Sequence, residues 1–319
     1  MLRFRTEITP GPLGFEIDHR TRLMSVGSCF AENMARRMER AKFHVKANPF
    51  GVVFNPLSVA SCLSRLLDGA PFTEADLSRD GERWFSYDCH GSFSSACAEG
   101  TLAAMNRALE EGSRALQGAE VVIVTLGTAW AYERRGRVVA NCHKMPASEF
   151  TRRRLSADET AASLEKAIGR MSGKRFILTV SPVRHLRDSL AENSLSKATL
   201  TVAAHALAGK YENVSYFPAY EILVDDLRDY RFYAEDMCHP TQQAVDYVWE
   251  KFCAAAMSPA TAALAVDVER IAAAVAHRPL NREGRGYEAF ARGMLERIAA
   301  LAAAHPEIDL TQETEYFTK

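Results

Sequence analysis

Short apolar runs alternate with longer amphipathic stretches along most of the chain. Unbroken apolar runs predict buried strands, and helical spacing of apolar positions predicts the helices between them. Strands are expected at about 23–26, 43–46, 121–126, 176–180 and 214–217, and helices at about 29–41, 59–67, 102–116, 157–171, 194–210 and 241–256. Strands that alternate with helices indicate an α/β fold with a doubly wound, parallel, five-stranded sheet.

Several stretches fall outside this alternation. Residues 70–100 are polar and aromatic and predict an insertion with a hairpin over a pocket, while residues 131–156 are expected to be irregular. The Ala-rich region beyond 257 predicts two accessory helices, at 261–276 and 288–304, broken around Pro279. The polar tail beyond Pro306 is expected to fray, and residues 1–21 to form an irregular lead-in.

These patterns divide the chain into an α/β domain at 1–257 and a helical extension at 258–319. The extension either covers the domain or provides a surface for a homo-oligomer.

Composition and charge narrow the classes of function. The chain has 319 residues, 47% hydrophobic and 25% charged, which is ordinary for a globular protein with a large core. The 39 Lys and Arg residues nearly balance 40 Asp and Glu, so nothing favours nucleic acid or an anionic membrane as partner. We find no apolar run that could span a bilayer and no signal-peptide pattern, and therefore expect a cytoplasmic protein without membrane insertion.

The seven cysteines have irregular spacing and include no C-x-x-C motif. This argues against a disulfide framework and a structural zinc site, and it fits a reducing compartment. Cys142 and Cys238 have histidines nearby but lack the compact spacing of metal ligands. We therefore expect neither a metal nor a cofactor.

The turn at Gly27-Ser28 is the first candidate for chemistry. A serine between a strand and a helix presents its hydroxyl beside a helix N-terminus, where developing negative charge is stabilised. Ser28 is thus either a nucleophile with an oxyanion donor or simply a helix cap. A base is available in Asp236 and His239, whose spacing of three lets the carboxylate fix the imidazole tautomer.

Residues 27–31 spell Gly-Ser-Cys-Phe-Ala, the motif that names the GSCFA family. That family resembles the SGNH, or GDSL-type, superfamily of esterases and lipases. Asp236-x-x-His239-Pro240 resembles the last sequence block of the superfamily, and Ser28 its first. The resemblance covers about residues 20–256 and implies an SGNH-hydrolase-like fold with flavodoxin-like layers of helix, sheet and helix.

The resemblance also implies roles for individual residues. Ser28 would be the nucleophile, and its N–H would be one oxyanion donor. His239 would be the general base and then the acid, oriented by Asp236. Gly51, which follows the second strand, would supply a second oxyanion donor through its N–H.

The third oxyanion donor of SGNH enzymes is an Asn in a G-x-N-D block. Here the block is Gly127-Thr128-Ala129-Trp130, so Ala129 stands where Asn is expected. Losing one donor typically costs roughly 3 kcal/mol of transition-state stabilisation. Thr128, Asn48 and Asn141 are the candidate replacements.

The substrate pocket is expected where the loops that follow the strands converge, beside Gly127 and Thr128. Among the histidines in irregular stretches, His143 is the first candidate for a substrate contact and His90 the second. His185 lies in a similar stretch, and any of the three could instead be structural.

The resemblance therefore implies a metal-independent serine esterase or acyltransferase. Its substrate would be a small acyl ester, and family analogy suggests an O-acyl group on a saccharide. A non-catalytic carbohydrate- or metabolite-binding protein on the same scaffold is the alternative. A third reading is a thiol-dependent enzyme that uses Cys29 or Cys142.

Overall fold

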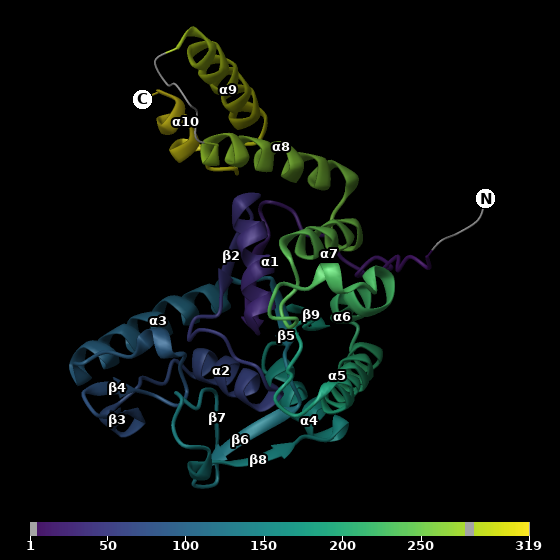
Figure 1. Ribbon diagram of the computed structural model, residues 1–319. Helices are drawn as coiled ribbons and strands as arrows, with labels where there is room; N and C mark the ends of the chain where they lie inside the picture. The colour runs from purple at the N-terminus through teal and green to yellow at the C-terminus, as the bar shows by residue number, and fades with distance from the viewer. Residues whose placement is uncertain (1–4, 278–283, 319) are drawn as a thin grey trace.

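The computed structural model describes residues 5–277 and 284–318. Its centre is a five-stranded parallel sheet with the order β10-β9-β5-β1-β2 (Figure 1). The strands are β1 (Arg22–Gly27), β2 (His44–Ala47), β5 (Val121–Leu126), β9 (Arg175–Val180) and β10 (Val214–Phe217). This confirms the doubly wound α/β fold. Counted from β2, the order is the flavodoxin-like 2-1-3-4-5, whose direction reverses between β1 and β5.

Alternate strand residues face opposite helical layers, because side chains in a strand point to alternate sides. Met24 and Val122 pack in a core with the helices of one face, whereas Leu23 and Ile123 pack with those of the other. The first layer contains α2 (Pro56–Asp68), α3 (Ala98–Gly118), α4 (Ala157–Gly169) and α5 (Leu190–Lys210). The second contains α1 (Cys29–Arg40) and α7 (Gln242–Ala256).

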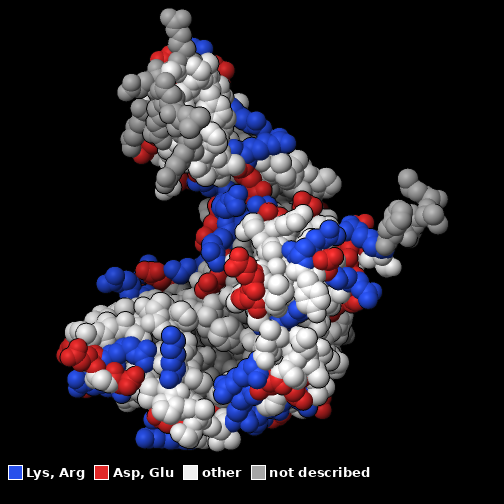
Figure 2. Space-filling view, in the orientation of Figure 1, with Lys and Arg blue, Asp and Glu red and all other residues white. Residues whose placement is uncertain are grey.

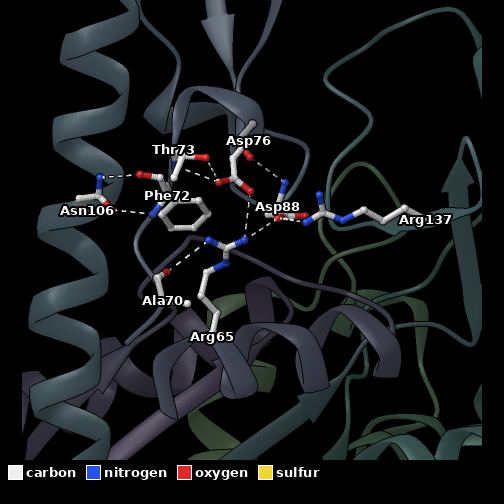
Figure 3. Close-up of polar contacts among 9 residues, drawn as sticks. Arg65, Ala70, Phe72, Thr73, Asp76, Asp88, Asn106 and Arg137 are labelled. Carbon is white, nitrogen blue, oxygen red and sulfur yellow. Dashed lines mark hydrogen bonds and ion pairs between the residues drawn. The ribbon is translucent and has the colours of Figure 1, made fainter. Parts of the chain in front are cut away.

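The insertion at 70–100 contains a hairpin of β3 (Ser78–Asp80) and β4 (Arg83–Phe85), with short helices η1 (Glu74–Asp76) and η2 (Gly91–Phe93). Figure 3 shows how Arg65 of α2 fastens this insertion. Its guanidinium lies 3.2 Å from Asp76 and 3.4 Å from Asp88, and Arg137 also pairs with Asp88. Two arginines thus face two carboxylates, so this cluster is a neutral, structural network.

The expectation of an irregular stretch at 131–156 is wrong. The segment forms an antiparallel sheet of β6 (Trp130–Arg134), β7 (Arg137–Val139) and β8 (Thr151–Arg154), with the order β7-β6-β8, and a short helix η3 (Ala147–Glu149). Tyr132 pairs with Arg152 in register, and Trp130 pairs with Arg154. These strands are stabilised by ion pairs and ring contacts of charged side chains instead of apolar burial. Their hydropathy is therefore low, and the pattern predicts a loop.

The C-terminal helices α8 (Pro259–Ala276), α9 (Arg285–Ala304) and α10 (Thr311–Thr318) build a separate apolar core. The expected fraying of the tail is wrong, because Phe317 is buried and Glu313 pairs with Lys42 at 2.8 Å. Arg37 of α1 also reaches Glu269 of α8 at 3.2 Å. The expected break at Pro279 lies outside the described residues.

The lead-in is irregular but docked, since the amides of Leu13 and Ile17 donate to the carbonyls of Ala255 and Ala256. Between β10 and α7 the chain forms α6 (Ala219–Glu221), the π-helix η4 (Ile222–Leu227) and η5 (Tyr230–Phe232). Within residues 5–277 and 284–318, no helix has the length and apolarity needed to cross a bilayer.

Candidate functional site

The Ser28 turn lies at the carboxyl end of β1, next to the switch point of the sheet. Gly27 is required there, because a Cβ would lie 2.1 Å from the carbonyl oxygen of Thr125 and its φ is +149°. Ser28 is 1% exposed and caps α1, with Oγ accepting the N–H of Phe30 at 3.3 Å. In this conformation its side chain acts as a helix cap.

The two predicted backbone oxyanion donors are engaged in this structure, contrary to expectation. The N–H of Ser28 donates to the carbonyl of Thr125 at 3.1 Å, and that of Gly51 donates to Asn48 at 2.7 Å. Both bonds close the turns that follow β1 and β2.

Asp236 and His239 are in contact, as the sequence predicts. Oδ2 of Asp236 lies 2.6 Å from Nδ1 of His239, and Oδ1 accepts the amides of Cys238 and His239 at 2.9 Å. The amide and ring of His239 lower the pKa of Asp236 to about 2. An ionised carboxylate only accepts, so Nδ1 of His239 is the donor in this contact.

A series of neighbouring residues links the Asp236–His239 pair to the Ser28 turn. The amide of Arg184, after β9, donates to the carbonyl of Cys238 at 3.0 Å. His185 lies within electrostatic range of His239 and Lys197, and Lys197 within range of Cys29. The pair and the turn therefore both belong to the carboxyl edge of the sheet.

Among the described residues, no hydrogen bond joins Ser28 to His239. The serine is buried under its own helix N-terminus, whereas the His239 side chain is 49% exposed. The Asp–His pair is thus assembled, and the Ser–His contact is not. Catalytic contacts often tighten only when substrate binds.

A cavity of about 320 Å³ lies beside this edge. Its walls come from the loops that follow β2, β5 and β9 and from the sheet of β6, β7 and β8. They include Phe54, Asn55, Thr128, Trp130, Tyr132, Val139, Ala140, Asn141, Cys142, Arg152, His185, Arg187 and Asp188. The cavity thus takes in two of the predicted pocket residues, Thr128 and Asn141.

Aromatic rings and arginines dominate the cavity wall. The guanidinium of Arg152 lies 3.9 Å from the centre of the Trp130 ring and forms a two-pronged pair with Asp188. Arg187 donates to the hydroxyl of Tyr132 at 2.7 Å. On the face that Figure 2 shows, basic and acidic side chains are interleaved around β6 and β8 rather than forming a field of one sign.

His185 is the histidine that lines the cavity. Burial and the charge of Lys197 lower its pKa to about 4, so its ring is neutral near pH 7. Its Nε2 is buried without a hydrogen-bond partner in the described part of the chain, as is Nε1 of Trp130. Together with Nε of Arg152, three polar atoms from the described residues of this wall have no hydrogen-bond partner.

His143 and His90, the predicted substrate contacts, do not line this cavity. His143 is buried against the Phe85 ring, and its Nε2 donates to the carbonyl of Ser86 at 2.8 Å. His90 caps η2 and packs over Gly51, where an added Cβ would lie 2.2 Å from the His90 Cβ. Both histidines support the insertion rather than line the cavity.

The three candidate replacements for the missing Asn differ in what they already bind. Asn48 accepts the N–H of Gly27 at 2.8 Å, and Oγ1 of Thr128 contacts Ser196 at 3.1 Å. Asn141 accepts the amide of His143 through Oδ1 at 2.8 Å and lines the cavity. The amide nitrogen of Asn141 is therefore the best placed of the three to meet a ligand.

Sequence reasoning missed the polar face of α5. Asn193, Ser196 and Lys197 are buried at helical spacing, and their side chains hold the loops after β5 and β9. Asn193 accepts the amide of His185 at 2.9 Å, and Ser196 accepts that of Ala129 at 2.8 Å. Their spacing of i, i+3 and i+4 puts them on one face of α5, but the helix carries other polar residues, so hydropathy does not single these three out.

Within the described ranges, the cysteines and possible metal ligands form no second candidate site. No cluster of three or more His, Cys, Asp or Glu side chains is placed to hold a metal ion there. All seven cysteines are free, and burial raises the pKa of both Cys29 and Cys142. A raised pKa disfavours the reactive thiolate, which weighs against the thiol-dependent reading.

Comparison with protein families gives two matches along the chain. The model of the GSCFA family matches residues 22–252, and that of the GSCFA domain protein, C-terminal domain, matches residues 268–319. A comparison with curated proteins finds no match. Since the first match includes the Ser28 turn, the sheet and the Asp236–His239 pair, and covers well over half of the sequence, the chain belongs to the GSCFA family.

Proposed function

We propose that this protein is a serine esterase or acyltransferase of SGNH type that acts on a small acyl ester. The observation that carries the proposal is the contact of Asp236 with His239 at the same sheet edge as the Ser28 turn. A carboxylate that fixes the tautomer of an imidazole provides the base that acyl transfer by a serine requires.

The reaction begins when Oγ of Ser28 attacks the ester carbonyl and Nε2 of His239 takes the hydroxyl proton. The tetrahedral intermediate collapses to an acyl-enzyme, and His239 returns the proton to the leaving alcohol. Water or a second alcohol then attacks the acyl-enzyme, with His239 taking and returning a proton as before. In the described conformation Oγ of Ser28 accepts the N–H of Phe30, and for this step its own O–H must donate to Nε2 of His239.

The size and lining of the cavity favour an ester whose alcohol part contains a ring. Its volume of about 320 Å³ lies at the small end of the range for ligand pockets. Trp130 and Tyr132 offer ring faces, while Asn141 and His185 offer polar groups at the wall. An O-acylated monosaccharide combines these two needs and is the substrate class to test first.

Intact-mass analysis after exposure to a fluorophosphonate probe tests the proposal. The Ser28 oxygen would bond to phosphorus, fluoride would leave, and the hydroxyl proton would pass to His239. We expect one adduct on the wild type and none on Ser28→Ala. Ser25→Ala, which changes another buried serine of the same strand region, is the matched control and should label normally. Absence of an adduct on folded wild type would reject the proposal.

The non-catalytic binding reading rests on a separate observation. Ser28 is buried, and the amides of Ser28 and Gly51 already donate to carbonyls. That reading predicts saturable binding of a saccharide or related metabolite in the cavity, with no fluorophosphonate adduct. Isothermal titration with unacylated monosaccharides, set beside the labelling result, separates the two functions.

A further inference from the structure

Lys197 lies beneath the carboxyl ends of two neighbouring strands. Its side chain is fully buried, at 0% exposure, on the face of α5 that meets the sheet. Its Nζ donates to the carbonyl of Gly127 at 2.6 Å and to that of Ser181 at 2.7 Å. Gly127 follows β5 and Ser181 follows β9, so one ammonium group fastens both strand ends.

Burying the charged side chain of Lys197 in the core costs folding free energy. Within the described residues no carboxylate pairs with it, and its other close neighbour is the Tyr220 ring, 5.8 Å from Nζ. A buried cation without a counter-ion costs free energy that a Leu or Met of similar size would not. A charge kept at such a place points to a use beyond packing.

The charge of Lys197 reaches the candidate site. Three groups face it from three elements: Cys29 of α1, His185 after β9, and Tyr220 of α6. Its charge acts to lower the pKa of both Cys29 and His185, and Cys29 is the residue next to Ser28. The charge of Lys197 thus acts on the residue next to Ser28, and its ammonium group holds the carbonyl of Gly127, in the block where Ala129 replaces the expected Asn.

We propose that Lys197 is a positioning residue of the Ser28 site, which holds the Gly127 and Ser181 loops and supplies the positive charge that a third oxyanion donor would otherwise provide. The inference rests on the proposed function. Lys197 takes no proton from the substrate and forms no bond to it. It acts because a fixed cation in a water-poor site stabilises the negative charge that develops on the substrate oxygen.

The chain offers a matched control at the opposite edge of the sheet. Nζ of Lys174 donates to the carbonyls of Ala119 at 2.6 Å and Gln117 at 3.1 Å, close to the amino ends of β5 and β9. Lys174 is thus a second lysine that holds two carbonyls, far from the Ser28 turn. If both lysines only held their loops together, replacing either one should change the labelling rate of Ser28 to the same degree.

The experiment measures the rate constant for fluorophosphonate labelling of Ser28 in the full chain. We expect Lys197→Met to lower it at least about tenfold, because one lost oxyanion donor costs more than this. Lys197→Arg should restore part of the rate, and Lys174→Met should leave it unchanged. Denaturant midpoints of all variants show whether each is folded at the labelling temperature.

The pH profile supplies a second measurement that does not depend on the Met variant folding. Burial lowers the pKa of Lys197 to about 7, so the wild type should lose labelling rate on the alkaline side as this charge is lost. Burial raises the pKa of Cys29 and of Tyr220, so neither neighbour loses a proton in that range, and His185, with a pKa of about 4, is already neutral. Lys197→Arg should keep its rate there, because arginine stays charged.

Each outcome decides between the two proposals. A labelled wild type with an equal rate in Lys197→Met, or with the same alkaline loss in Lys197→Arg, overturns the role of Lys197 and leaves the proposed function standing. A folded wild type that does not label at all overturns the proposed function, and the role of Lys197 falls with it.

Discussion

Oδ2 of Asp236 lies 2.6 Å from Nδ1 of His239, and Oδ1 of the same carboxylate accepts two backbone amides of their own loop. The carboxylate of Asp236 is therefore held by its own loop, independently of Ser28. The carbonyl of Cys238 in this loop also accepts the amide of Arg184, which fixes the loop to the segment after β9.

Asp236→Asn should slow fluorophosphonate labelling of Ser28 roughly 10³- to 10⁴-fold, because an amide no longer fixes the imidazole tautomer. The low pKa of Asp236, about 2, keeps the carboxylate ionised above pH 4, so the wild-type profile should show no step from this group there. Asp229→Asn is the control, since Asp229 accepts the amide of Arg231 in a similar nearby turn. Equal losses in both variants would contradict a specific role for Asp236.

Unfolding free energy should rise with pH between about 7 and 10.5 because of Lys197. Burial depresses the pKa of this lysine from 10.5 to about 7, so in that window the unfolded chain binds the extra proton and folding is favoured as the pH rises. One proton gives a slope of at most about 1.4 kcal/mol per pH unit. Urea unfolding should show this contribution in the wild type and lose it in Lys197→Met, and identical slopes would count against it.

Gly51→Ala should destabilise the fold by about 2 kcal/mol or more, for two reasons that add. Its φ is +80°, and a new Cβ would lie 2.2 Å from the Cβ of His90. Gly136→Ala separates the causes, because Gly136 has a φ of +77° and nothing within 4 Å. Chemical denaturation should show a loss of about 1 to 2 kcal/mol for Gly136→Ala, from backbone strain alone. A cost at Gly51 no larger than this would mean that His90 moves aside freely.

Trp130→Leu should weaken binding of a ring-bearing ester while a small fluorophosphonate still labels Ser28. Trp130 presents its ring to the cavity with Arg152 stacked on it at 3.9 Å. Trp84, with Arg79 at 5.3 Å, is a similar stacked pair in the β3–β4 hairpin, outside the cavity, so Trp84→Leu is the control. A KM about tenfold higher for Trp130→Leu alone would support the cavity as the substrate pocket, and unchanged kinetics would exclude Trp130 from it.

The central sheet was predictable because β5 and β9 are buried on both faces and therefore read as unbroken apolar runs. The strands β6 and β8 were not, since their stability comes from pairs such as Arg153 with Glu133, which hydropathy does not register. The sequence shows where charged residues lie along the chain, but not which of them form pairs across neighbouring strands.

The same limit applies to the site. The contact of Asp236 with His239 followed from a local spacing of three, whereas the oxyanion donors depend on where single amides point. The amide of Gly51 donates to the carbonyl of Asn48 and closes a turn that Asn48, Pro49 and Gly51 favour, so this donor is engaged within its own loop. The sequence carries no signal that Lys197 is buried, and only the carbonyls at the ends of β5 and β9 explain its burial.

The apolar core shared by α8, α9 and α10 has a consequence for how the molecule opens. This cluster has its own interior and is joined to the rest of the molecule by Ala265 and by ion pairs such as Arg37–Glu269 and Lys42–Glu313, so we expect it to unfold as its own cooperative unit. The amide hydrogens of these helices can then exchange with solvent through a partial unfolding that leaves the α/β fold around Ser28 and His239 intact. Salt, which weakens the connecting ion pairs, would lower the free energy of that opening more than it lowers the stability of the sheet.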